Sequence, residues 1–218
     1  MPANQLIETQ FLVLRKTPYS ESSLVLAGLS PDQGQLHFMV RGARRLGRRQ
    51  FPLADVFRVL TVQYRSRPEG LLAWQSADVT NDLTGVAAHF STYQTAAWLA
   101  KFTLGNVAAD TENPELFAAM INALSLLQEK ARGKSAAPCV EPAMIVGTVL
   151  VFLQENGLLR DYADKPRLRR KRDRLIAMGR GQQPIPTITT RDWKRLYDWI
   201  VALLHTSECK VPPPPSFP

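Results

Sequence analysis

The hydrophobic pattern of this chain changes its period near residue 80, and that change constrains the fold more than any other feature. Between Gln10 and Ser76, short runs of aliphatic, β-branched and aromatic residues are separated by turn residues. From about residue 83, apolar residues recur at every third or fourth position instead. The sequence therefore predicts a β domain followed by an α domain, with the join near residues 77–84.

Five short strands are expected in the first 80 residues, at 10–16, 22–30, 35–41, 55–65 and 71–76. Pro31-Asp32-Gln33-Gly34 predicts a hairpin between the second and the third, because proline presets the turn and glycine tolerates its exit geometry. Five strands with turns between them favour a small closed sheet. We expect an α+β fold, with a five-stranded OB-like β-barrel at residues 1–80 followed by an all-α helical domain.

Helices are expected from about residue 83 to 102, 114 to 132, 142 to 156 and 191 to 204. Asn113-Pro114-Glu115 is typical of a helix start, and Thr190 is expected to cap the last helix. The helical domain is expected at residues 81–210, with a basic insertion at 160–182 on its surface. The proline-rich residues 211–218 are expected to form a frayed tail.

The charge of the chain lies in two blocks. Lys and Arg number 27 against 19 Asp and Glu. Residues 1–80 have a net charge of +4, residues 81–158 of −3, and residues 159–218 of +7. Two positive blocks that flank an acidic middle indicate a polyanionic partner, which is most simply nucleic acid or an anionic membrane surface.

Two runs and one aromatic residue are the candidate nucleic-acid contacts. The first run places five arginines in nine residues, with two glycines that allow close approach to phosphate: Arg41, Arg44, Arg45, Arg48 and Arg49. The second holds seven cations and one acid: Lys165, Arg167, Arg169, Arg170, Lys171, Arg172 and Arg174. A bound polyanion accounts for such density, and the alternative is a disordered, solubilising loop. Tyr19, in a loop between strands, is the candidate for stacking on a base.

No arrangement of residues predicts catalysis, a cofactor or a metal site. The three histidines are scattered, and Cys139 and Cys209 lie 70 positions apart without other ligands nearby. No apolar run reaches the roughly 18 residues that span a bilayer, and the first residues lack the pattern of a signal peptide. We therefore expect a cytoplasmic protein that is not an enzyme.

Three segments resemble the opening of the RecO family of bacterial recombination mediators: Tyr19-Ser-Glu-Ser-Ser-Leu-Val-Leu26, the turn at Gly34, and Val40-Arg-Gly-Ala-Arg-Arg45. Glu115-Leu-Phe117 and Phe152-Leu-Gln-Glu-Asn-Gly157 are similar to the family's helical domain. The resemblance implies an OB fold, a helical domain, binding of single- and double-stranded DNA, annealing of complementary strands and a nucleoid-associated location. It also implies RecR and the C-terminal tail of single-strand-binding protein as partners, together loading the recombinase RecA.

The chain departs from many members of that family at one point. These members carry a four-cysteine zinc module after a helix that ends in glycine, whereas Gly157 is followed by no such cysteines. The chain is thus similar to the branch without zinc, and the Lys165–Arg174 run stands where the module would be.

The last expected helix supplies a candidate site for the tail peptide implied by the resemblance. An acidic peptide with an aromatic end needs an apolar pocket and cations. Trp193, Leu196, Tyr197 and Ile200 form an apolar stripe on this helix, and Arg191, Lys194 and Arg195 lie beside it. The alternative is that the stripe belongs to the core and the basic run serves only DNA.

Three functions stay open at this point. The first is a DNA-binding and annealing mediator without bond-making activity. The second is an RNA-binding OB-fold protein of the ribosome or of RNA metabolism, because a basic OB fold alone does not distinguish DNA from RNA. The third is an enzyme, which a cluster of titratable groups in a deep cleft would favour.

Overall fold

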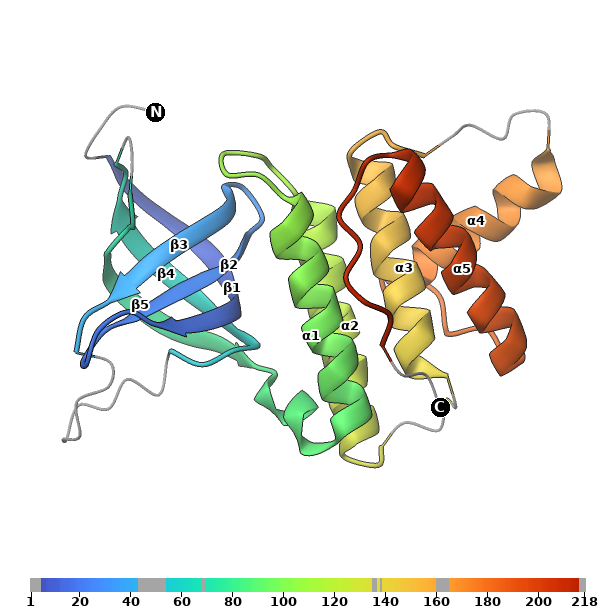
Figure 1. Cartoon of the computed structure of the whole chain (residues 1–218), viewed down its shortest axis with the longest axis horizontal. Helices are drawn as coiled ribbons and strands as arrows, with labels where there is room; N and C mark the ends of the chain where they lie inside the picture. Colours follow the sequence, from blue (N-terminus) through green and yellow to red (C-terminus); the bar gives the residue numbers. More distant parts are fainter. Residues whose placement is uncertain are drawn as a thin grey trace. The chain divides into compact units, whose positions relative to one another are not determined.

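The computed structural model describes residues 5–42, 54–67, 70–134, 137, 139–159 and 165–215. The chain forms two compact units (Figure 1). The β unit consists of Met1–Thr84 and the later loop Val107–Pro114, and the helical unit consists of Gly85–Asn106 and Glu115–Pro218. The first unit thus ends where the period of the sequence changes, and it also includes a loop that the sequence pattern did not assign to it.

The β unit is one antiparallel five-stranded sheet, which together with the helices confirms the α+β class. Its strands lie in the order β3-β2-β1-β4-β5. They are β1 (Leu6–Pro18), β2 (Leu24–Ser30), β3 (Gly34–Val40), β4 (Arg58–Arg65) and β5 (Trp74–Asp82). The last strand begins later than expected and extends through polar residues, because β5 lies at the edge of the sheet with most of its side chains exposed or partly exposed.

The sheet is OB-like, but the expected closed barrel is wrong. In the described residues, the edge strands β3 and β5 form no continuous ladder. Instead, the segment between β4 and β5 makes a single parallel bridge between Leu72 and Phe38. The Met39 amide donates to the Leu72 carbonyl at 2.8 Å, and the Leu72 amide donates to the His37 carbonyl at 2.9 Å. A turn-rich segment therefore occupies the place of the closing ladder.

The alternation predicted for β3 is confirmed. Leu36, Phe38 and Val40 are buried, and Phe38 packs edge-to-face on Phe11 and Tyr64 with ring centroids 5.0 and 5.2 Å apart. His37 and Met39 lie on the opposite face and are partly exposed. This alternation leaves the outer face of β3 available for a ligand.

Over its described residues, the helical unit contains one more α-helix than expected. After the short 3₁₀ helix η1 (Thr84–Ala88) come α1 (Phe90–Asn106), α2 (Pro114–Ala131), α3 (Val140–Glu155), α4 (Pro166–Gly179) and α5 (Thr190–Thr206). Residues 140–153 of α3 are all buried, as its apolar sequence predicts. The cap of α5 is Thr189 and not Thr190, because the Asp192 amide donates to the Thr189 hydroxyl at 3.1 Å.

The basic segment expected as a surface insertion or a disordered loop is helix α4 over its described residues. Lys165 precedes Pro166, which stands in the first turn, where its missing amide hydrogen is not needed. Leu175, Ile176 and Met178, near the end of α4, are buried and anchor the helix to the unit. The basic first half of α4 is exposed. The helix thus has a charged, exposed first half and an apolar end that packs into the unit.

Helices α3 and α4 approach most closely at a pair of glycines. A Cβ atom on Gly179 would lie 2.5 Å from the Gly147 carbonyl oxygen, which is less than real Cβ contacts allow. We expect Gly179→Ala to destabilise the protein by about 1–3 kcal/mol, measured as a lower midpoint in thermal or urea unfolding.

Gly105→Ala in α1 is the matched control, because its Cβ would meet only the Lys210 side chain at an ordinary 3.5 Å. That substitution is expected to be neutral or to stabilise by up to about 1 kcal/mol, since alanine favours helices over glycine. Equal effects of the two substitutions would contradict the close contact between α3 and α4.

The expected frayed tail is wrong as far as Pro215. Asn106, at the end of α1, donates from its side chain to the Lys210 carbonyl at 2.9 Å and accepts from the Lys210 amide at 2.8 Å. Pro212 and Pro215 are buried. The segment after α5 therefore runs back along the other helices of its unit (Figure 1).

Candidate nucleic-acid interface

A cavity of about 410 Å³ lies on the β unit, beside the outer face of β3. It is lined by Tyr19 from the β1–β2 loop, by Met39 and Arg41 at the end of β3, and by Arg67, Leu71 and Ala73 from the segment between β4 and β5. Tyr19 and Arg41 were predicted from the sequence as nucleic-acid contacts, and the structure brings them together. Arg67 and the apolar residues were missed, because Arg67-Pro68-Glu69-Gly70 indicates only a turn.

Local structure explains how Tyr19 is presented. The Tyr19 amide donates to the Ser23 carbonyl at 3.0 Å, and the Ser23 amide donates to the Ser20 hydroxyl at 3.2 Å. These bonds order the β1–β2 loop, while 62% of the surface of Tyr19 stays exposed. An exposed ring on an ordered loop is suited to stacking, because little side-chain freedom is lost on binding.

The electrostatics of this cavity suit a nucleic-acid strand. Within the described part of the chain, neither Arg41 nor Arg67 forms an ion pair. A free guanidinium can bind a phosphate through two hydrogen bonds or stack on a base. The cavity thus combines an aromatic platform, an apolar lining and two available cations. The other predicted contacts of this run, Arg44, Arg45, Arg48 and Arg49, lie outside the described residues.

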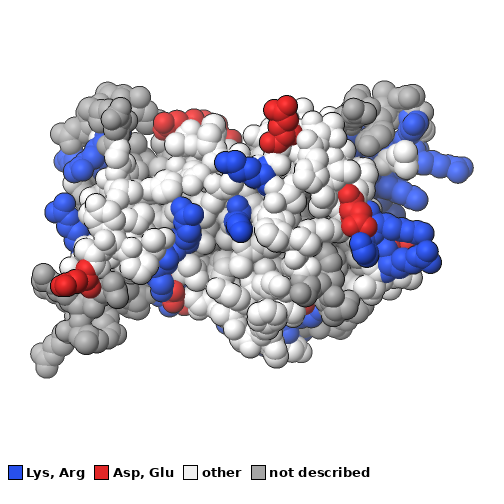
Figure 2. Space-filling view, in the orientation of Figure 1, with Lys and Arg blue, Asp and Glu red and all other residues white. Residues whose placement is uncertain are grey.

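The second basic run presents a cationic face on α4. Asp173 pairs with Arg172 at 2.9 Å and with Arg169 at 3.9 Å. The other cations of the helix form no ion pair among the described residues, and helical spacing places them on one side: Arg167, Arg170, Lys171 and Arg174. Figure 2 shows Lys and Arg side chains gathered at the end of the helical unit where α4 lies.

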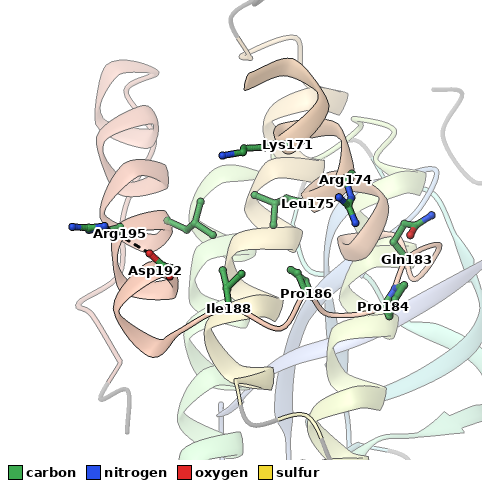
Figure 3. Close-up of a pocket in the computed structure, with 10 residues that line it drawn as sticks. Lys171, Arg174, Leu175, Gln183, Pro184, Pro186, Ile188, Asp192 and Arg195 are labelled. Carbon is green, nitrogen blue, oxygen red and sulfur yellow. Dashed lines mark ion pairs between the residues drawn. The ribbon is translucent and has the colours of Figure 1, made fainter. Parts of the chain in front are cut away.

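A larger cavity, of about 510 Å³, lies between α4 and α5 (Figure 3). Leu175, Pro184, Pro186 and Ile188 give it an apolar lining, and Lys171, Arg174, Gln183, Asp192, Arg195 and Leu196 complete it. Lys171 and Arg174 come from α4, and Arg195 comes from α5, where it pairs with Asp192 at 3.7 Å. The cavity joins an apolar interior to a cationic rim.

The apolar stripe predicted to hold a peptide is core instead. Trp193 is 1% exposed and Tyr197 6% exposed, and Tyr197 packs against Trp98 of α1 with ring centroids 6.2 Å apart. Ile200 is fully buried. Burial in the unit leaves these side chains no surface for a ligand, because the stripe of an amphipathic helix normally faces its own core.

Of the other residues predicted for the peptide site, some line the cavity between α4 and α5 and some do not. Leu196 and Arg195 line the cavity between α4 and α5. Arg191 and Lys194 are exposed but do not line it, and Lys194 pairs with Asp198 at 3.0 Å. Four further lining residues were not among the site residues predicted from the sequence: Gln183, Pro184, Pro186 and Ile188.

No group of three or more His, Cys, Asp or Glu side chains in the described part of the chain could hold a metal ion. No helix built from the described residues is long and apolar enough to cross a membrane.

Residues 4–82 match the family model described as Recombination protein O N terminal. This region is similar to the N-terminal domain of the RecO family. The match covers the sheet and contains Tyr19, Arg41 and Arg67, and it confirms the resemblance noted in the N-terminal residues. No curated protein matches the chain significantly. The similarity of residues 4–82 to this domain supports a place in a family of DNA recombination and repair.

Proposed function

We propose that this chain is a RecO-family protein that binds single- and double-stranded DNA, anneals complementary strands and helps to load RecA, without bond-making chemistry of its own. The observation that carries the proposal is the cavity of Tyr19, Arg41 and Arg67. It is formed by the β1–β2 loop, the β4–β5 segment and β3, which are the parts that OB folds use to bind oligonucleotides. Such a function implies a location in the cytoplasm, at the nucleoid.

Annealing follows from cationic surfaces that hold two strands. Bound arginines and lysines replace counterions, lower the repulsion between strands and leave base pairing to select the product. Stacking on Tyr19 would add affinity for any unpaired base, because every base has a π face. The free cations of α4 supply a second surface for phosphates.

The contribution of Tyr19 is tested with Tyr19→Ala in the full chain. We expect its affinity for a single-stranded oligonucleotide to fall roughly 5- to 150-fold, because stacking on one base contributes about 1–3 kcal/mol. Duplex affinity should change less than twofold, since paired bases do not reach the ring. Fluorescence anisotropy with both DNA forms measures the difference.

Tyr93→Ala is the matched control, because Tyr93 is an exposed tyrosine on α1. An unchanged single-strand affinity of Tyr19→Ala would overturn the stacking role. Equal binding of an RNA strand, together with no annealing of DNA, would favour the RNA-binding alternative.

We further propose that the cavity between α4 and α5 binds the acidic, aromatic-ended tail of single-strand-binding protein, a partner that the family implies. Its apolar lining suits a terminal ring, and Lys171, Arg174 and Arg195 suit carboxylates. We thus propose this cavity as the peptide site in place of the apolar stripe of α5, which is buried. RecR remains a partner proposed on the family alone, without an assigned surface.

The peptide site is tested by titrating the full chain with a labelled tail peptide. The double variant Lys171→Ala and Arg174→Ala is expected to bind at least tenfold more weakly, and salt should weaken binding to the unaltered chain. Lys194→Ala is the control, since this cation lies outside the cavity and pairs with Asp198. Full affinity in the double variant would show that the peptide binds elsewhere.

A further inference from the structure

A second cavity, of about 270 Å³, adjoins the first on the β unit. Arg67 lines both. The short segment after it supplies alternate residues, since Gly70 and Leu72 line the second cavity and Leu71 and Ala73 line the first. This segment is therefore the wall between two neighbouring cavities.

The second cavity is lined by groups that can recognise the edge of a base. Gln35 and His37 of β3 line it, together with Ser66, Arg67 and Asp110. The Gln35 amide nitrogen lies 3.0 Å from the His37 Nε2 atom. Donors and acceptors are thus close together, and a base edge presents the same mixture.

Histidine and tyrosine keep neutral side chains in this cavity. Burial, with the charge of Arg15, lowers the pKa of His37, so its ring is uncharged at neutral pH and Nε2 can accept from the Gln35 amide. Burial, with the nearby carboxylates of Asp32 and Asp110, raises the pKa of Tyr64 to about 12, so its hydroxyl keeps its proton. The cavity therefore offers neutral hydrogen-bonding groups at Gln35 and His37, together with the charged groups of Arg67 and Asp110.

The spacing of the two cavities selects the form of the strand. His37 lines one and Met39 the other, and they lie two residues apart on the outer face of β3, which is about 6.7 Å. Stacked bases are about 3.4 Å apart. Bases in both cavities would therefore be unstacked, and a duplex could not supply them.

We propose that the second cavity binds the base next to the one on Tyr19, so that the β unit holds two consecutive, unstacked bases of a single strand. The inference rests on the proposed function, because it needs a strand at the first cavity. It adds a hydrogen-bonding site to a stacking site. The β unit would then prefer single strands through geometry, in addition to charge.

The test is photocrosslinking of the full chain to a single-stranded oligonucleotide in which 5-iodouracil replaces thymine, followed by mass spectrometry of the peptides. Crosslinks are expected at Tyr19 or Met39 in the first cavity and at His37 in the second. Crosslinks at Tyr19 or Met39 alone would overturn the second cavity and leave the proposed function intact. Crosslinks that avoid the β unit would overturn both.

Binding measurements give an independent readout of the same inference. His37→Ala and Gln35→Ala are each expected to lower single-strand affinity at least threefold without changing duplex affinity. His205→Ala is the matched control, because this histidine lies exposed on α5 in the other unit. Loss of both affinities together, or of neither, would contradict a base site at the second cavity.

Discussion

Four cations of α4 form no ion pair with any described residue, and changing them to alanine is expected to flatten the plot of log affinity for DNA against log salt by about 3 to 4 units. The residues are Arg167, Arg170, Lys171 and Arg174. Each phosphate contact contributes about 0.9 to the slope on duplex DNA and about 0.7 on single strands. At low salt, affinity should fall at least tenfold. Titrations at several salt concentrations measure both quantities.

A variant with Lys16→Ala and Lys194→Ala is the control for this experiment. Both lysines are already paired, Lys16 with Asp55 at 2.7 Å and Lys194 with Asp198 at 3.0 Å. Their removal lowers the net charge but takes away no free cation, so we expect the slope to stay nearly unchanged. The α4 variant should unfold like the unaltered chain, because exposed substitutions usually cost under about 0.5 kcal/mol. An unchanged slope in a folded α4 variant would exclude α4 from the DNA surface.

Lys130→Met is expected to destabilise the helical unit by about 3–5 kcal/mol. The Lys130 ammonium pairs with Glu141 at 2.5 Å, and the Glu141 side chain is only 2% exposed. Removing the lysine leaves a buried carboxylate without its counter-charge, which costs far more than the loss of a surface pair. The unfolding midpoint should fall by about 10 °C, measured by circular dichroism or calorimetry.

Two control variants distinguish the loss of the buried ion pair from a general loss of charge. Lys194→Met removes an exposed pair with Asp198 and should change stability by less than about 1 kcal/mol. Adding Glu141→Leu to Lys130→Met should restore much of the lost stability, because no buried charge then remains. A double variant as unstable as the single one would contradict the role of Glu141.

Local patterns predicted most of the elements, since each depends on neighbours in the sequence. Leu36, Phe38 and Val40 alternate with polar residues, and alternation alone places them in the core of the sheet. Helix α4 was missed because only its last third is apolar. Its basic first part contains too few apolar residues to show the helical period of the sequence. The open edge of the barrel also escaped prediction, because closure depends on contacts between segments far apart in the sequence.

Some residues of the candidate site could be predicted from the local sequence, whereas others join the site only through the fold. Tyr19 and Arg41 could be singled out as an aromatic loop residue and the start of an arginine run. Arg67 joins them only through the path of the β4–β5 segment. The stripe of Trp193 and Tyr197 would be apolar both as a peptide site and as part of the core. The sequence does not indicate which other element packs against it. The structure shows that the stripe belongs to the core, because Tyr197 packs against Trp98 of α1.

Annealing of complementary oligonucleotides by the full chain, at about 50 mM and about 200 mM salt, tests the central claim most directly. The account predicts that the chain accelerates annealing at the lower salt concentration, that the acceleration falls steeply at the higher one, and that both Tyr19→Ala and the α4 variant reduce it. A chain that binds DNA and yet leaves the annealing rate unchanged at both concentrations would contradict the proposed function.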